Sequence, residues 1–320
     1  MDTGSHLVFG ASLAGLACLD PSVGGSDSMF HAVLIGTLIG SHAPDFDSIV
    51  RFKGPKAYIR HHRGITHSVP ALFLWPLLLS LPLAAIFGVL SSWSHLYGWI
   101  FTAVCFHVFL DLFNAYGVQC FRPFTAKWFH LDTLSIFDPF LFTMHAGGLL
   151  VWILSDVNAG EMFKSLFGVT FVYILLRFIH QRWIVYKVRE HFGNTGNCHV
   201  IPSLHWFYFQ FMVETEQQFK TGYVRYGRII HKDTYTKGEE NPMIQASIHT
   251  DGVRAFLHFA QRVHVMCLEH RDGYKVVWSD MRFWHNHKLP FGAEVELDRN
   301  LNVISDTLGW NKKSWEAPYV

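Results

Sequence analysis

Long apolar runs broken by ionisable side chains constrain the fold of this chain more than any other feature of its sequence. The run 94–116 reads SHLYGWIFTAVCFHVFLDLFNAY and contains His107, Asp111 and Asn114. Their i, i+4, i+7 spacing places all three on one face of a helix. A second apolar run opens with His67. Because a His and an Asp inside a membrane bundle are costly unless something binds them, a divalent metal ion is the simplest explanation.

Six apolar segments predict a helical membrane domain over residues 1–190. Two of them, Leu7–Leu19 and Met29–Ile39, are shorter than the roughly 20 residues that cross the hydrocarbon core, and we expect two short N-terminal membrane helices there. Four longer runs predict four strong spans, at His67–Leu90, Ser94–Tyr116, Phe137–Leu154 and Phe163–Val185.

The last third of the chain predicts a small β-rich soluble domain over residues 191–320. A Gly- and Asn-rich linker at 193–197 is followed by short β-rich runs, and two tripeptides are typical of hairpin turns, Arg271–Gly273 and Asp298–Asn300. The expected strands are Tyr223–Ile230, Val263–Leu268, Tyr274–Trp278, Phe291–Leu297 and Leu301–Ile304. The fold class is therefore an α-helical multi-span membrane domain followed by an antiparallel sheet.

Basic residues gather on alternate loops and predict the orientation of the chain. Loop 41–65 holds five Lys or Arg residues and loop 117–136 holds two, whereas 91–93 has none and 156–164 has one. The positive-inside rule places the basic loops and the C-terminal domain in the cytoplasm of a multi-pass inner-membrane protein. His67, His107 and Asp111 then lie near the inner ends of their spans, and His6 joins them if the early segments also cross.

Charge and cysteine usage exclude several classes of protein. The net charge is +1 with His neutral and no basic face emerges, so we expect no nucleic-acid partner. The five cysteines form no C-x-x-C pair, which argues against a disulfide framework and against a Cys-rich zinc site.

The segment 40–47, GSHAPDFD, carries two carboxylates on either side of one residue. Pro44 stops a helix, and Asp45 and Asp47 after it could bind one cation or bridge two. The alternative is that both carboxylates cap the following turn.

The segment 61–68, HHRGITHS, carries three histidines around a Gly. We favour His67 and one of His61 and His62 as metal ligands, and Arg63 could hold a phosphate or a carboxylate with its guanidinium fork. The alternative is a basic stretch that meets anionic lipid, with Thr66 or Ser68 as a helix cap. That alternative explains the Arg and Lys residues better than the histidines.

The His and Asp residues at one depth are numerous enough to hold one or two metal ions. His107 and Asp111 could instead form a buried hydrogen-bonded group that joins helices, but such contacts contribute only about 0.6 kcal/mol each. Ligation by His and Asp without Cys suits Zn²⁺ first, and Mn²⁺ or Fe as well. Asn114 is expected to orient a ligand. The predicted metal ligands are His6, Asp45, Asp47, His62, His67, His107 and Asp111.

Two further carboxylates have more ordinary interpretations. Asp138, which precedes Pro139, could add a ligand to the site or cap the helix that begins there. Asp280 and Arg282 share one face of a strand and are expected to form a surface salt bridge. The histidines of the last third have no tight ligand spacing and are expected to be ordinary sheet and loop residues.

These motifs resemble a known family. The order S-H-x-x-P-D-x-D, H-R-G-x-T-H-S and H-x3-D is similar to the membrane-bound metal-dependent hydrolases of the YdjM type, often labelled inner-membrane-associated, LexA-binding hydrolases. The resemblance covers about residues 1–155, beginning with Thr3 and His6, and the added C-terminal domain resembles the YfhP-type variant. It implies a bound metal and hydrolase chemistry. The H-x3-D element is also similar to zinc-dependent phospholipase C and related nucleases.

The sequence therefore predicts a membrane-embedded metal-dependent hydrolase with its site at the cytoplasmic face. A metal ion lowers the pKa of bound water to about 7. Asp45 or Asp47 would accept the proton or bridge two ions, and Arg63 would stabilise negative charge on a lipid phosphate or phosphate ester. The alternative is a non-enzymatic membrane protein with a structural metal site and a cytoplasmic domain that recruits a partner. Ion transport is disfavoured, because the polar residues cluster at one depth.

Overall fold

A computed structural model describes residues 1–238 and 241–310 of the chain. These residues form two compact units. The first contains Met1–Asp47 and Arg63–Ile179, and the second contains Ser48–His62 together with the chain from His180 onward. The segment Ser48–His62 thus belongs with the C-terminal part of the chain although it lies between two motifs of the N-terminal part.

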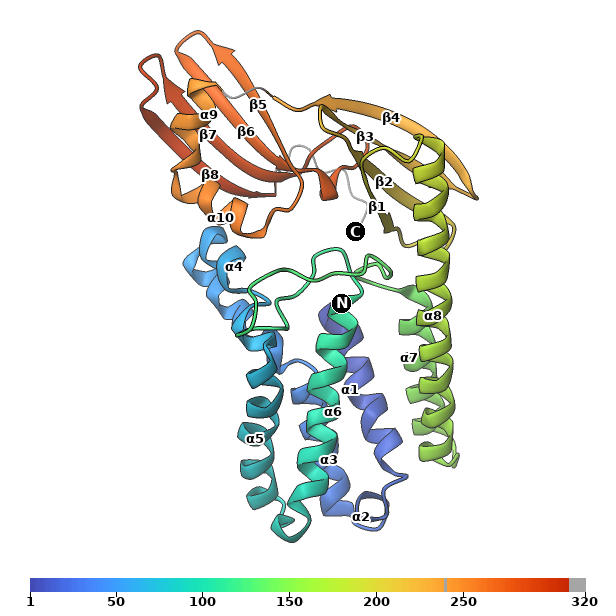
Figure 1. The fold of residues 1–320 in the computed structure, drawn as a ribbon. Helices are drawn as coiled ribbons and strands as arrows, with labels where there is room; N and C mark the ends of the chain where they lie inside the picture. The colour runs from blue at the N-terminus through green and yellow to red at the C-terminus, as the bar shows by residue number, and fades with distance from the viewer. Residues whose placement is uncertain (239–240, 311–320) are drawn as a thin grey trace. The chain divides into compact units, whose positions relative to one another are not determined.

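The first unit is a bundle of helices (Figure 1). Three helical stretches are long and apolar enough to cross a membrane, and they are Val69–Ile86, Leu90–Leu112 and Ala159–His191. The expected run Phe137–Leu154 forms a helix of 16 residues, so a count of four strong spans is not confirmed. Its helices are α1 (Thr3–Ala17), α2 (Pro21–Gly24), α3 (Asp27–Gly40), α5 (Val69–Ile86), α6 (Trp93–Leu112), α7 (Pro139–Leu154) and α8 (Ala159–His191), with 3-10 turns η1 (Ala43–Lys53), η2 (Ile65–His67) and η3 (Leu90–Ser92). The C-terminal parts of η1 and α8 belong to the second unit.

Small residues let the helices that carry the site approach one another closely. A Cβ atom built on Gly10 of α1 would lie 2.4 Å from Ser41 Oγ and 2.8 Å from the Thr37 carbonyl oxygen. One built on Gly36 of α3 would lie 2.6 Å from Ile100 of α6. In membranes such close backbone contact drives helix association, because lipid tails are as apolar as the side chains. Helix α3 is therefore held between α1 and α6.

Asp138 caps α7, as one of its two interpretations predicted. Its Oδ1 atom accepts hydrogen bonds from the backbone N–H groups of Phe140 and Leu141, both at 3.1 Å. Its Oδ2 atom accepts one from the Tyr173 hydroxyl of α8 at 2.7 Å. One oxygen of this buried carboxylate thereby caps α7, and the other joins it to α8.

The second unit contains two four-stranded antiparallel sheets, ordered β1-β2-β3-β4 and β5-β6-β7-β8. The strands are β1 (Asn197–Pro202), β2 (Tyr208–Glu214), β3 (Gln218–Arg225), β4 (Arg228–Thr236), β5 (Val263–His270), β6 (Gly273–Asp280), β7 (Phe291–Asp298) and β8 (Val303–Trp310). The helices are α4 (Pro55–His61), α9 (Pro242–Ile248) and α10 (Asp251–Phe259), with the 3-10 turn η4 (Met281–Phe283). A C-terminal domain of antiparallel sheets is confirmed, although it has two sheets and more strands than expected.

Helix α4 packs against α10 and β8 within the second unit. Lys56 Nζ lies 2.8 Å from Asp306 Oδ2, and Arg60 Nη2 lies 2.6 Å from Asp251 Oδ1. Ion pairs that solvent still reaches contribute little individually, so these two specify which surface α4 contacts more than they stabilise it.

Two predictions for this unit were wrong in detail. The run Tyr223–Ile230 is not one strand, because Tyr226 and Gly227 have positive φ angles of 49° and 75° and form the turn between β3 and β4. The pair of Asp280 and Arg282, which was expected at the surface, is buried: Asp280 is 0% exposed and Arg282 is 4% exposed. Arg282 donates to Asp280 at 2.7 Å and to the Phe259 carbonyl oxygen at 3.1 Å, and these contacts compensate its burial.

Candidate metal centre

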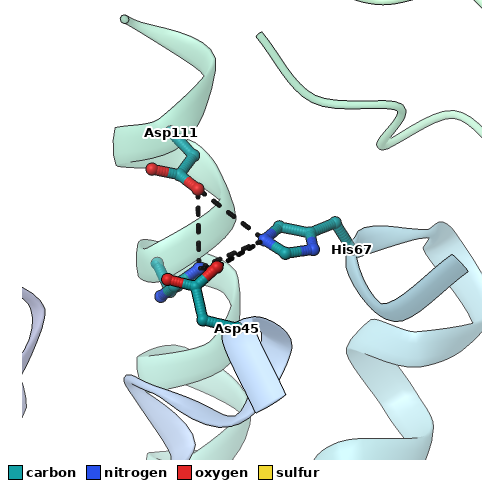
Figure 2. A group of neighbouring side chains, drawn as sticks. Asp45, His67 and Asp111 are labelled. Atoms are coloured by element: carbon teal, nitrogen blue, oxygen red, sulfur yellow. Dashed lines mark hydrogen bonds and ion pairs between the residues drawn. The ribbon is translucent and has the colours of Figure 1, made fainter. Parts of the chain in front are cut away.

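Four side chains from separate segments converge inside the first unit. Asp45 comes from η1, His67 from η2, and His107 and Asp111 from α6, and each is at most 8% exposed. One ligand atom from each lies within 4.8 Å of the other three. Figure 2 shows Asp45, His67 and Asp111 pointing toward one another beside α6. We call these four residues the His/Asp cluster.

The spacing within the His/Asp cluster fits a single ion. The Nε2 atoms of His67 and His107 are 3.3 Å apart. The Oδ1 atom of Asp45 lies 3.4 and 3.7 Å from these two nitrogens, and the Oδ2 atom of Asp111 lies 3.6 Å from each. Four atoms bound tetrahedrally to one Zn²⁺ at about 2.0–2.2 Å are about 3.3–3.6 Å apart.

Hydrogen bonds on the outer side of each imidazole turn a lone pair toward the centre of the cluster. His107 Nδ1 lies 2.7 Å from the Ser41 carbonyl oxygen, which only accepts, so Nδ1 carries the proton. Thr66 Oγ1 donates to Asp47 Oδ2 at 2.5 Å and therefore accepts from His67 Nδ1 at 3.0 Å. In neutral imidazoles both Nε2 atoms then lack a proton. Such outer contacts orient the ligands of metal sites.

The inner atoms of the cluster need a cation. Asp45 Oδ1 and Asp111 Oδ2 are buried without a hydrogen-bond partner. Two lone-pair nitrogens and two carboxylate oxygens thus face one another within a few ångströms. Without a positive charge between them, these four atoms make the buried site unfavourable, because their negative charges and partial charges repel one another strongly at low dielectric. A proton shared by the cluster or a bound metal ion would remove that cost.

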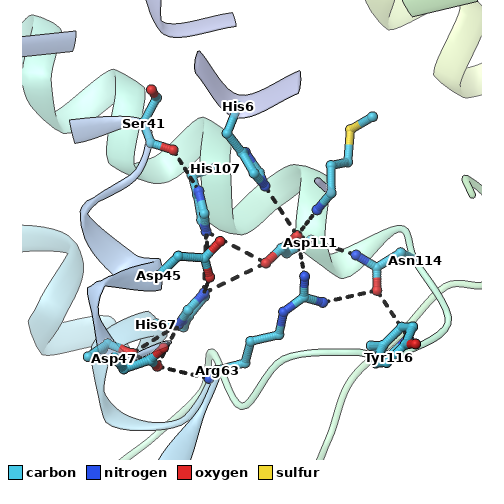
Figure 3. A network of polar contacts seen from close by, with 12 residues as sticks. His6, Ser41, Asp45, Asp47, Arg63, His67, His107, Asp111, Asn114 and Tyr116 are labelled. Carbon is cyan, nitrogen blue, oxygen red and sulfur yellow. Dashed lines mark hydrogen bonds and ion pairs between the residues drawn. The ribbon is translucent and has the colours of Figure 1, made fainter. Parts of the chain in front are cut away.

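The second carboxylate oxygen of Asp111 is surrounded by positive and polar groups. Arg63 Nη2 donates to Asp111 Oδ1 at 3.1 Å, and Asn114 Nδ2 donates to the same atom at 3.3 Å. The Met1 amino group also donates to it, and His6 Nε2 lies 3.4 Å away. Figure 3 shows this network around Asp111. Asn114 therefore contacts a predicted ligand, as its helical spacing indicated.

Arg63 is held in an unusual backbone conformation that serves this network. Its φ angle is +60°, and its side chain is buried. The backbone N–H donates to Asp47 Oδ2 at 3.0 Å, and Nη1 donates to Asn114 Oδ1 at 3.1 Å. The guanidinium thus neutralises part of the charge of the cluster from one side. Its predicted contact with a substrate phosphate stays a prediction.

The remaining predicted ligands occupy different positions. His6 stacks on His107 with ring centroids 3.8 Å apart, and Asp47 contacts His67 through Thr66. His62 belongs to the second unit, where it stacks on Tyr58 at 4.6 Å, so its part in the site stays a prediction. Sequence reasoning missed the bridging role of Thr66, although the T-H pair placed its hydroxyl next to a candidate ligand.

Two members of the His/Asp cluster lie outside the spanning helices and have shifted pKa values. Burial alone would raise the pKa of Asp45, but the nearby imidazoles of His107 and His67 hold it well below its usual range. Burial would lower the pKa of His67, but its closeness to Asp111 and Asp45 raises it above the usual value. Without a metal ion, the two carboxylates therefore favour the protonated form of His67.

Fold and site together define a membrane protein whose apolar helices enclose a cluster of His and Asp side chains able to hold a metal ion. The chain belongs to the YdjM inner membrane protein family, which matches residues 1–184. Residues 242–317 match the YfhP C-terminal alpha/beta plait domain. The Bacillus subtilis (strain 168) protein named "Uncharacterized protein YfhP" is 36% identical over 313 residues, which cover 97% of this chain and 95% of that protein. No solved structure matches the chain.

Proposed function

We propose that the His/Asp cluster binds a divalent metal ion and that the chain is a metal-dependent hydrolase acting at the cytoplasmic face of the inner membrane. The observation that carries this proposal is the convergence of two imidazole nitrogens and two carboxylate oxygens, with separations of 3.3–3.7 Å and outer hydrogen bonds on both imidazoles. When bound, a divalent ion supplies a nucleophile by lowering the pKa of a water molecule to about 7.

The chain's own residues would share the work around that ion. Asp45, His67, His107 and Asp111 would hold it, with Zn²⁺ first and Mn²⁺ or Fe as alternatives. Asp47, which accepts from Thr66 and from the Arg63 backbone, is a candidate to take up a proton. Arg63 would keep Asp111 in place, because its Nη2 atom donates to the Asp111 oxygen that faces His6.

The place of the site supports a lipid or phosphate ester as the substrate class. His67 lies two residues before α5, which is long and apolar enough to cross the membrane, so the cluster sits near the end of a span. A lipid phosphate or another phosphate ester at headgroup depth is the substrate that we propose. The C-terminal unit would lie in the cytoplasm, on the side that the basic loops indicate.

One observation favours a second candidate function. Four protein ligands that are all buried are typical of structural zinc sites, whereas catalytic zinc sites have three protein ligands and an open position. The cluster could therefore clamp η1, η2 and α6 together without catalysis. Ions that accept six ligands, such as Mn²⁺ and Fe, would keep open positions in the same cluster.

Turnover by the purified protein separates these candidates. The full chain in detergent should hydrolyse a phospholipid or phosphate ester when Zn²⁺ or Mn²⁺ is supplied, and His107→Ala and Asp111→Ala should each abolish that activity. His264→Ala, which changes a histidine of β5 far from the cluster in sequence, is the matched control. Metal bound with high affinity but no turnover on any lipid or ester would favour the structural role.

A further inference from the structure

The loop between α6 and α7 carries an arginine whose surroundings point to a ligand (Figure 1, the green segment). The Nε atom of Arg122 is buried, and no acceptor reaches it among the described residues. A guanidinium is always charged, and leaving one of its N–H groups buried without an acceptor is costly. Its planar fork matches the oxygens of a phosphate group.

Exposed apolar residues lie close to this arginine in the sequence and in the segment that its loop contacts. Phe121 is 47% exposed and Phe124 is 84% exposed, although both are large and aromatic. Ile65, in η2, is 69% exposed. Grouped apolar side chains on a surface mark an interaction site, and beside a membrane span the simplest partner is the boundary between headgroups and acyl chains.

Backbone hydrogen bonds fix this loop to both sides of a metal-ligand segment. The Gln119 N–H donates to the Arg63 carbonyl oxygen at 3.0 Å, and the Val69 N–H donates to the Arg122 carbonyl oxygen at 3.2 Å. The loop therefore brackets residues 64–68, which include His67. Gln119 Nε2 also donates to the Ala126 carbonyl oxygen at 2.7 Å and closes the loop upon itself.

The same bonds set the depth of the loop. Val69 is the first residue of α5, and α5 exposes Phe73 and Leu74, each 53% exposed, along its apolar surface. Phe121 and Phe124 thus lie in a loop whose backbone is fixed to the first residue of a spanning helix. A charged Arg between two such side chains has the composition of a lipid-headgroup site at a membrane interface.

From these observations we infer that residues 119–126 form a binding site for the phosphate of an anionic membrane phospholipid. Arg122 binds the phosphate, and Phe121 and Phe124 contact the upper part of the acyl chains. This inference concerns lipid binding and does not require turnover. The loop would present a lipid phosphate next to the segment that carries His67. The further step, that this lipid is the substrate of the His/Asp cluster, rests on the proposed function.

The test counts lipid molecules bound to the full chain. Detergent-purified protein, treated with a chelator, is titrated with phosphatidylglycerol, and bound lipid is measured by native mass spectrometry. Arg122→Gln should weaken one lipid site at least about tenfold, as expected for the loss of a charge-assisted contact. Lys127→Gln removes the same charge from the same loop and should change binding less than about twofold. Phe124→Ala should weaken binding, and Phe124→Leu should restore most of it.

Two results would overturn this inference. One is equal lipid binding by Arg122→Gln, Lys127→Gln and the unchanged chain, each folded as judged by circular dichroism. The other is displacement of phosphatidylglycerol by millimolar glycerol phosphate, which would show a site for soluble phosphate. Because the assay uses metal-free protein, its outcome is independent of hydrolysis. Lipid binding that depends on Arg122 without any turnover would count against the proposed function alone.

Discussion

Replacement of Thr66 by valine tests whether the outer hydrogen bonds of the cluster serve metal binding. Valine has nearly the shape of threonine but lacks the hydroxyl that accepts from His67 Nδ1 at 3.0 Å and donates to Asp47 Oδ2 at 2.5 Å. Loss of an outer partner typically lowers metal affinity about 10–100-fold, which corresponds to about 1.4–2.7 kcal/mol. That range agrees with the cost of leaving a buried donor without a partner, about 1–3 kcal/mol.

The assay is a competition between the purified chain and a chelating dye for Zn²⁺ or Mn²⁺. Thr66→Ser keeps the hydroxyl and should keep the dissociation constant within about threefold of the unchanged chain. Thr66→Val should bind the ion about 10–100 times more weakly with unchanged helix content. Equal affinity in Thr66→Val and the unchanged chain would refute the reasoning that this hydroxyl orients His67.

Three other predictions concern protons, a buried ion pair and helix packing. Since the pKa of His67 is raised in the metal-free protein, metal binding below that pKa should release about one proton. The apparent metal affinity should then fall about tenfold for each pH unit below that pKa. Calorimetry in buffers of different ionisation enthalpy measures the release, and no release would mean that His67 is not a ligand. Arg282→Met should destabilise the second unit by about 3–5 kcal/mol and lower its melting temperature, because Asp280 would stay buried without its partner. Arg299→Met removes one member of an exposed pair and should leave the melting temperature unchanged. Gly10→Ala should lower the free energy of unfolding by about 1–3 kcal/mol, because the new Cβ atom would meet Ser41 and Thr37. Gly98→Ala, whose Cβ atom would meet no atom within 4 Å, should change that free energy by less than about 1 kcal/mol. Equal melting temperatures of the two variants would contradict the close contact of α1 and α3.

The sequence was sufficient to predict which segments could meet in the cluster. Helical spacing placed His107 and Asp111 on one face, and the apolar runs placed His67 at the end of a span. The structure brings these three together with Asp45. Four of the seven predicted ligands thus lie in one group, and their binding of a metal stays a prediction.

Long-range contacts were beyond sequence reasoning. Helix α4 is positioned by ion pairs with Asp251 and Asp306, which lie about 190 and 250 residues after their partners in the chain. No local sequence pattern predicts partners at such separations. The burial of Asp280 was missed for a similar reason, because Phe259 and Phe283, which cover Arg282, come partly from another element. Strand β1 has the sequence NCHVIP, which is short and ends in proline, so the sequence does not predict a strand there or its pairing with β2.

Elemental analysis of the purified chain tests most directly the proposal that the cluster is a metal site. We expect one or two divalent ions per chain, and we expect His67→Ala combined with His107→Ala to lose them while the protein keeps its helix content. A chain that folds and retains its helices but holds no stoichiometric metal, even after incubation with Zn²⁺, Mn²⁺ and Fe²⁺, would contradict the account. In that case a proton on His67 would be the cation that the cluster requires.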